Sequence, residues 1–143
     1  MVPVQWSRNL SQGIPLIARL VRDLAEALHA YDVEIVETHH RGKREAPSGT
    51  ALLLAEAIAE GRDQRLEEHA VYGRFGESLR AEGEIGIHAL RGGLVFGEHS
   101  ILFAGADEEI RFTHRALSRR AFARGAIEAA LTLPERAPGL TRP

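Results

Sequence analysis

The chain has 143 residues, of which 44% are hydrophobic, and this is enough for one domain with a packed core. Its 18 basic and 20 acidic residues leave a net charge of −2, which gives no reason to expect nucleic-acid or membrane binding. The absence of cysteine excludes disulfides and thiolate chemistry. With no signal-peptide pattern and no apolar run of membrane length, we expect a cytoplasmic protein.

The first residues predict a short strand or linker followed by a helix. Apolar and polar residues alternate over positions 2–6, which is a strand pattern. Ser11 is a predicted N-cap, and Pro15 is tolerated because it falls in the first helical turn. Apolar residues then recur at helical spacing, which indicates a helix that packs on a core. They are Ile17, Leu20, Val21, Leu24 and Leu28.

A strand is predicted to bring two adjacent histidines to the end of a sheet. Val33 and Ile35 alternate with acidic neighbours up to Glu37, and His39 and His40 follow. Neighbouring strand residues point to opposite faces, and the spacing to the other histidines matches no metal motif. We therefore predict no metal site.

The segment after this strand has the features of an anion site at a helix N-terminus. Ser48 is a predicted N-cap for a helix that ends at Gly61, which we expect to be its left-handed terminus. Gly49 leaves the backbone open, and Thr50 adds a hydroxyl beside the free N–H groups of the first turn. A simple cap without a ligand is the alternative.

Charged and titratable residues precede this helix. Lys43, with Arg41 or Arg44, can add charge-assisted hydrogen bonds that suit a carboxylate. His39 and His40 can exchange a proton near neutral pH. A solvated basic loop is the alternative interpretation of the cations.

The second half of the chain predicts three consecutive antiparallel strands and a last helix. Residues 70–72 form a short strand, and 75–81 a mobile loop. Strands over 85–89 and 94–103 are joined by a tight hairpin at Gly92-Gly93, and a third strand covers 108–114. Ser118 caps a helix with one apolar side, and residues 137–143 form a frayed tail.

These elements predict an α+β fold. It has a mixed, mainly antiparallel sheet of about four strands, with helices packed on one face. Residues 1–10 are predicted to be a hinge or the last strand of another domain, residues 11–114 a substrate-binding and oligomerisation domain, and residues 115–143 a C-terminal return helix and tail.

Two long motifs resemble the signature of the 4-hydroxy-tetrahydrodipicolinate reductase (dihydrodipicolinate reductase) family. The first runs from His39 to Lys43 and continues over residues 46–51. The second comprises residues 85–87, 91–93 and 97–99. The opening, with Asn9, Ser11 and Gly13, also resembles the family, so the resemblance extends over residues 4–133. Leu94 stands where the family usually has an acidic residue, and Glu45 where it usually has aspartate.

This resemblance implies an enzyme of diaminopimelate and lysine biosynthesis. Such enzymes reduce a cyclic unsaturated dicarboxylate with hydride from NADPH or NADH. The resemblance implies that His39 is the proton donor and Lys43 the charge stabiliser. It places His40, Gly49 and Thr50 on the substrate carboxylates. It further implies a homotetramer assembled through the sheets, with the last helix packed on a coenzyme domain.

No G-x-G-x-x-G fingerprint occurs in the chain, so we expect the coenzyme domain of the family to lie outside it. The isolated chain is then expected to be inactive. One alternative is a catalytically inert dicarboxylate-binding or oligomerisation module. A second is a hydrolase that uses His39 with Ser48, although no nucleophile-elbow pattern surrounds this serine.

Overall fold

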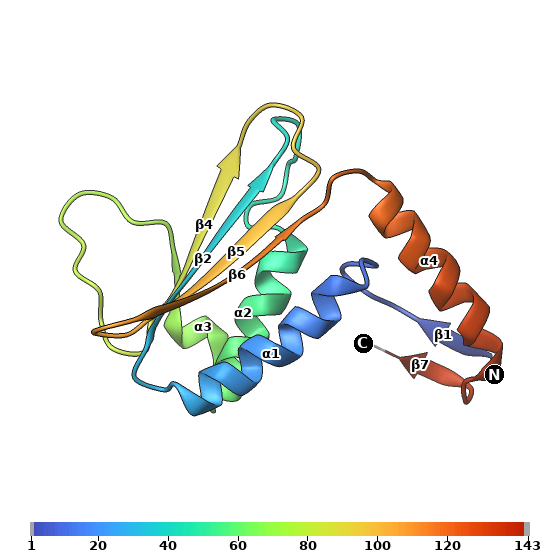
Figure 1. Ribbon diagram of the computed structural model, residues 1–143, viewed down its shortest axis with the longest axis horizontal. Coiled ribbons are helices and arrows are strands. Elements are labelled where there is room, and N and C mark those ends of the chain that lie inside the picture. The colour runs from blue at the N-terminus through green and yellow to red at the C-terminus, as the bar shows by residue number, and fades with distance from the viewer. Residues whose placement is uncertain (1, 142–143) are drawn as a thin grey trace.

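The structure is a computed structural model in which residues 2–141 are described (Figure 1). The elements in chain order are β1 (Pro3–Gln5), α1 (Gly13–Ala27), β2 (Asp32–His39), α2 (Gly49–Gly61), α3 (Leu66–His69), β3 (Ala70–Tyr72), β4 (Ile85–Arg91), β5 (Glu98–Ala104), β6 (Glu109–Arg115), α4 (Arg120–Thr132), the 3₁₀ helix η1 (Leu133–Glu135) and β7 (Gly139–Thr141). No helix among the described residues is long and apolar enough to cross a membrane.

The main sheet has five strands in the order β3-β4-β2-β5-β6. Its central strand, β2, runs parallel to β4 and antiparallel to β5, and β5 pairs antiparallel with β6. The α+β class with a mixed sheet is therefore confirmed. The prediction of a hairpin at Gly92-Gly93 is wrong, because β2 lies between β4 and β5, the two strands that the hairpin was expected to join. The connection instead crosses the end of β2, where Gly92 N donates to His39 O and His40 N to Val95 O.

Helices α1 and α2 lie side by side over one face of the sheet (Figure 1). The core between these layers is apolar and fully buried; its largest members are Val21, Val33, Ile35, Leu54, Ile58, Ile85, Ile87, Ile101 and Phe103. Gly61 has no positive φ, so the predicted left-handed terminus is wrong; Asp63 adopts that conformation with φ 53°. A Cβ at Gly61 would lie 2.2 Å from the carbonyl oxygen of Arg22, so this glycine permits the close approach of α1 and α2.

The two ends of the described chain meet in a second, two-stranded parallel sheet. β1 pairs with β7, with Pro3 opposite Gly139. The predicted frayed tail is thus wrong over Gly139–Thr141, and residues 142–143 lie outside the described residues. A Cβ at Gly125 of α4 would lie 1.6 Å from the carbonyl oxygen of Leu10, so α4 packs directly on the backbone that leads to α1.

The two other predicted caps differ in detail. Helix α1 begins at Gly13 and has no side-chain cap, because the Ser11 hydroxyl instead lies 3.0 Å from Nε2 of His114 on β6. Helix α4 begins at Arg120, whose backbone N–H donates to the Ser118 hydroxyl at 3.3 Å. Ser11 therefore joins the segment before α1 to the sheet.

Candidate functional site

A cavity of about 340 Å³ lies where the end of β2, the start of α2 and the segment before α1 meet. Its volume is within the range of small-molecule sites. The residues that line it include no carboxylate. They are Ser7, Arg8, Asn9, Leu10, His39, His40, Lys43, Ser48, Gly49, Thr50, Phe96 and Phe122. The structure thus brings together all five predicted site residues, His39, His40, Lys43, Gly49 and Thr50.

The start of α2 presents open backbone donors to this cavity. Ser48 is the N-cap as predicted, and its Oγ accepts a hydrogen bond from Ala51 N at 3.1 Å. Within the described part of the chain, the N–H groups of Gly49 and Thr50 have no hydrogen-bond partner. Unpaired N–H groups and the helix dipole at this end favour an anion.

Two side-chain cations lie at the cavity. Lys43 Nζ is 3.3 Å from Glu45 Oε2, but this glutamate is largely exposed and can be displaced by a ligand. Arg8 precedes α1 and pairs with Glu56 of α2 at 2.7 Å. Arg41 and Arg44, which the sequence offered as partners of Lys43, are exposed and do not line the cavity. Arg8, and not Arg41 or Arg44, is the arginine that lines the cavity together with Lys43.

Both histidines reach the cavity, although adjacent strand residues point to opposite faces. The reason is that β2 ends at His39. His40 belongs to a turn in which the backbone N–H of Lys43 donates to the His40 carbonyl at 3.0 Å. Strand alternation therefore no longer applies to His40.

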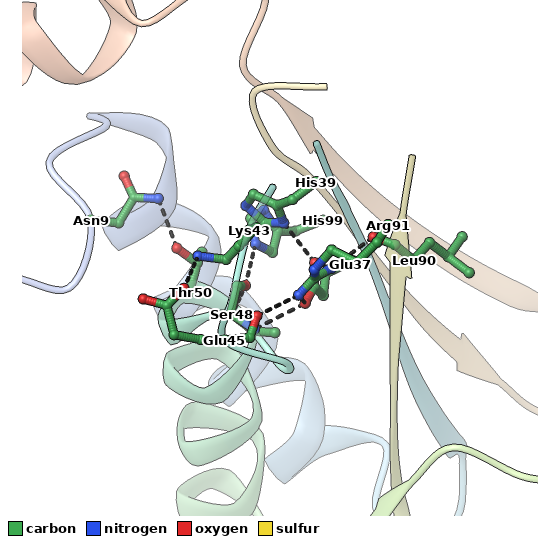
Figure 2. Close-up of polar contacts among 11 residues, drawn as sticks. Asn9, Glu37, His39, Lys43, Glu45, Ser48, Thr50, Leu90, Arg91 and His99 are labelled. Atoms are coloured by element: carbon green, nitrogen blue, oxygen red, sulfur yellow. Dashed lines mark hydrogen bonds and ion pairs between the residues drawn. The ribbon is translucent and has the colours of Figure 1, made fainter. Parts of the chain in front are cut away.

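Glu37 is fully buried and links His39 to the start of α2 (Figure 2). His39 Nδ1 lies 2.6 Å from Glu37 Oε2, and the backbone N–H of Ser48 donates to Oε1 at 2.9 Å. Arg91 donates from Nη1 to Oε2 at 2.8 Å and from Nη2 to Oε1 at 2.7 Å. One carboxylate thus orients the histidine and the helix cap together.

The electrostatics of this cluster fix where the proton of His39 resides. Burial alone would raise the pKa of Glu37, but hydrogen bonds from Arg91, His39 and Ser48 hold that pKa below its ordinary value. Glu37 is therefore an anion that only accepts, so Nδ1 of His39 carries a hydrogen and Nε2 is the atom free to exchange one. Burial lowers the pKa of His39, and the positive charges of Lys43 and Arg91 lower it further against the opposing effect of Glu37.

His99 of β5 completes the buried cluster. Its Nε2 is 2.9 Å from Ser48 Oγ, and its ring meets that of His39 edge-on, with centroids 5.2 Å apart. Burial lowers the pKa of His99 to about 4, so it is neutral near pH 7. The histidine beside Ser48 is thus His99, which removes the geometric basis for a hydrolase that uses His39 with Ser48.

Sequence reasoning missed Glu37, Arg91, His99 and Arg8 as site residues. The signal for the first was available, because Glu37 and His39 are two apart on one strand and share a face. His99 pairs opposite Glu37, and Arg91 opposite His39, only through the register of β2 with its neighbours. Among residues 2–141, no group of three or more His, Asp or Glu side chains is placed to hold a metal ion.

Comparisons with known proteins show the family of this chain. The family described as "Dihydrodipicolinate reductase, C-terminus" matches residues 13–142. The 4-hydroxy-tetrahydrodipicolinate reductase of Rubrobacter xylanophilus is 60% identical over 97% of this chain and 54% of its own length. The enzyme of the same name from Granulibacter bethesdensis is 51% identical over 98% of this chain and 55% of its own length.

A solved structure has the same fold. Dipicolinate-bound dihydrodipicolinate reductase from Paenisporosarcina sp. TG-14 superposes with a TM-score of 0.74 at 28% identity, over 99% of this chain and 53% of that one. This chain thus spans about half the length of the relatives that it matches. The chain belongs to the dihydrodipicolinate reductase family and corresponds to its C-terminal part.

Proposed function

We propose that this chain is the substrate-binding part of a 4-hydroxy-tetrahydrodipicolinate reductase of diaminopimelate and lysine biosynthesis. The observation that carries the proposal is the cavity at the start of α2, where a proton donor, cations and open N–H groups converge without any carboxylate in the lining. A small dianion fits these charges. The names of the relatives, and the dipicolinate bound to one of them, support a cyclic dicarboxylate.

The binding groups follow from the geometry. A substrate carboxylate at the start of α2 accepts from the N–H groups of Gly49 and Thr50 and from the Thr50 hydroxyl. His40 contacts a carboxylate from the turn. Lys43 exchanges its exposed partner Glu45 for the ligand and stabilises the negative charge that develops during reduction.

His39 donates the proton that completes the reduction. Its Nδ1–H is committed to Glu37, so the hydrogen on Nε2 of the imidazolium is the one delivered to the substrate. General acid catalysis of this kind contributes roughly 10²–10⁴-fold to a rate. Glu37 supports it by holding the ring in one orientation and by stabilising the charged form.

The chain's own residues do not fit the nicotinamide coenzyme. Residues 2–141 contain no strand, glycine-rich turn and helix with the dinucleotide fingerprint, and we assign no coenzyme-binding residue. The hydride of the reaction comes from NADPH or NADH held elsewhere in the complete enzyme. What this chain supplies is binding, orientation and the proton.

We further propose that the enzyme is a cytoplasmic homotetramer assembled through the main sheet. Helices α1 and α2 cover one face only, and Val36 and Leu90 on the opposite face are 37% and 52% exposed. Apolar side chains that are exposed among the polar residues of a sheet face are stabilised when a second sheet covers them.

A chimaera tests the catalytic part of the proposal. This chain would replace the matching part of the Rubrobacter xylanophilus enzyme, and oxidation of NADH or NADPH by the cyclic dicarboxylate would be followed. We expect turnover by the chimaera and none by the chain alone. His39→Ala and Lys43→Ala should each reduce kcat/KM at least about 10²-fold. Arg41→Ala is the matched control, because Arg41 is exposed and outside the cavity.

The inert-module alternative gives a different result in the same experiment. A chimaera that folds and binds dipicolinate but does not turn over would favour a binding or assembly role. Full activity in both the His39 and the Lys43 variants would contradict the assigned roles.

A further inference from the structure

Asn9 lies in the segment between β1 and α1 and forms a hydrogen bond with the hydroxyl of Thr50, a residue of the anion site. Its Nδ2 donates to Thr50 Oγ1 at 2.8 Å, across 41 positions of sequence (Figure 2). Its Oδ1 accepts from the backbone N–H of Ser11 at 2.7 Å, and its carbonyl accepts from the Ser7 hydroxyl at 2.6 Å. Asn9 and Thr50 both line the cavity.

These contacts fix the orientation of the Asn9 amide. The backbone N–H of Ser11 can only donate, so the atom that faces it must be the amide oxygen. The NH₂ group is then the one that faces Thr50, and it can only donate. Thr50 Oγ1 is therefore an acceptor in this pair, and its single hydrogen remains available for another acceptor.

The free hydrogen of Thr50 has few acceptors within reach. Thr50 is only 6% exposed, and it lines the cavity at the start of α2. The cavity that it lines contains the open N–H groups at the start of α2 and no carboxylate of the protein. Among the described residues no second side-chain contact of Thr50 Oγ1 is found, so this hydrogen is available to an acceptor that enters the cavity.

We propose that Asn9 is a positioning residue for the dicarboxylate site, which commits the Thr50 hydroxyl to donate to a substrate carboxylate. The inference rests on the proposed function and extends it to a residue outside the stretch from His39 to Ala51. It also ties the site to the connecting segment, because Leu10 next to Asn9 carries the carbonyl against which Gly125 of α4 packs. A shift of this segment therefore changes the donor set that the ligand meets.

Asn9→Asp tests the donor role of Asn9 most directly. Aspartate has the same shape and keeps the acceptor for Ser11 N, but it offers Thr50 an acceptor in place of a donor. The Thr50 hydroxyl then donates to Asp and no longer to the ligand. A hydrogen bond to a charged group is lost, so we expect dipicolinate to bind roughly tenfold or more weakly to the chain.

A double-mutant cycle separates this effect from the added negative charge. Dipicolinate would be titrated into the unmodified chain, Asn9→Asp, Thr50→Val and the double variant. In the Thr50→Val background the hydroxyl is absent, so Asn9→Asp there reports the charge alone. We expect the loss from Asn9→Asp to be several-fold smaller in that background. The neutral pair Asn9→Ala and Thr50→Val gives the same test without any charge.

A kinetic split tests positioning against a merely structural role. In the chimaeric reductase, Asn9→Asp should raise KM for the dicarboxylate with little change in the pH profile of kcat, which reports His39. Equal losses from Asn9→Asp with and without the Thr50 hydroxyl would overturn this inference while leaving the proposed function intact. Failure of the unmodified chain to bind dipicolinate would overturn both.

Discussion

Arg91 holds both oxygens of the buried Glu37 carboxylate, with N–O distances of 2.8 and 2.7 Å. The same two oxygens accept from His39 Nδ1 and from the backbone N–H of Ser48. A bidentate pair of this kind fixes the carboxylate in one plane. Glu37 therefore sets the position of His39, the proposed proton donor, relative to the start of α2, the proposed anion site.

Glu37→Gln should damage both stability and catalysis. The amide keeps the shape but leaves the Arg91 guanidinium without its counter-ion, and breaking a buried pair typically costs about 3 kcal/mol. An amide can also turn its NH₂ group toward Nδ1 of His39 and so favour the wrong tautomer. We expect urea unfolding to show the loss of stability, and kcat of the chimaeric reductase to fall at least roughly tenfold. Unchanged stability would show that the pair has no such role.

Dipicolinate binding should take up protons near pH 7.5. Burial, followed by the charges of Lys43 and Arg91, lowers the pKa of His39 in the free protein, so its neutral form dominates there. A dianion beside Nε2 favours the imidazolium and raises that pKa. Affinity should then fall as pH rises above neutrality. The binding enthalpy should differ between HEPES and Tris buffers in proportion to their ionisation enthalpies.

His39→Gln is the control for this linkage, because it removes the titrating ring and should remove the buffer dependence. Identical enthalpies in the two buffers with the unmodified chain would contradict the proton uptake.

The stability of the fold should fall between about pH 6.5 and pH 4. The pKa of the buried His99 is about 4, against an ordinary value of 6.5 that applies to the unfolded chain. Within this window the unfolded state binds a proton that the folded state does not, so acid favours unfolding. The full effect is roughly 3 kcal/mol, present above pH 6.5 and lost as the pH approaches 4.

Urea unfolding across this range measures the slope. The pKa values of His39 and His114 are also lowered by burial, so they add a dependence of the same sign. His99→Gln should remove the pH dependence of stability that His99 contributes and keep the pH dependence that His39 and His114 contribute. A slope that is equal in the two proteins would contradict the assignment to His99.

Val36→Lys should weaken assembly without unfolding the chain. Val36 is on the central strand, on the face that α1 and α2 leave uncovered. A charge there would oppose burial against a second sheet. Light scattering should show the proposed tetramer for the unmodified protein and smaller species for the variant. A monomeric unmodified protein at micromolar concentration would contradict assembly through this face.

The sequence predicted those features that depend on local pattern. The cap at Ser48, the core strand before His39 and the five predicted site residues all lie within one continuous stretch, residues 33–50. The periodicity of apolar residues in helices and strands is also a local pattern, and it predicted the helix and sheet layers. The family resemblance implied a role for each of the five site residues, and all five line the cavity.

Features that depend on long-range pairing could not be predicted in this way. Gly92-Gly93 is a strong local hairpin signal, yet both flanking strands gain more by pairing with β2, which is buried on the helix side. Arg91 and His99 become site residues only through that pairing. Gly61 was assigned by its usual role at helix ends, whereas its function here is to admit the Arg22 carbonyl of a neighbouring helix.

Calorimetric titration of the chain with dipicolinate tests the central claim most directly, with Lys43→Ala and the exposed Arg44→Ala as a matched pair. The account predicts one bound dipicolinate per chain, binding that is lost in Lys43→Ala and binding that is retained in Arg44→Ala. Absence of binding to the unmodified chain, or equal binding to both variants, would contradict the claim that the cavity at the start of α2 is a dicarboxylate site.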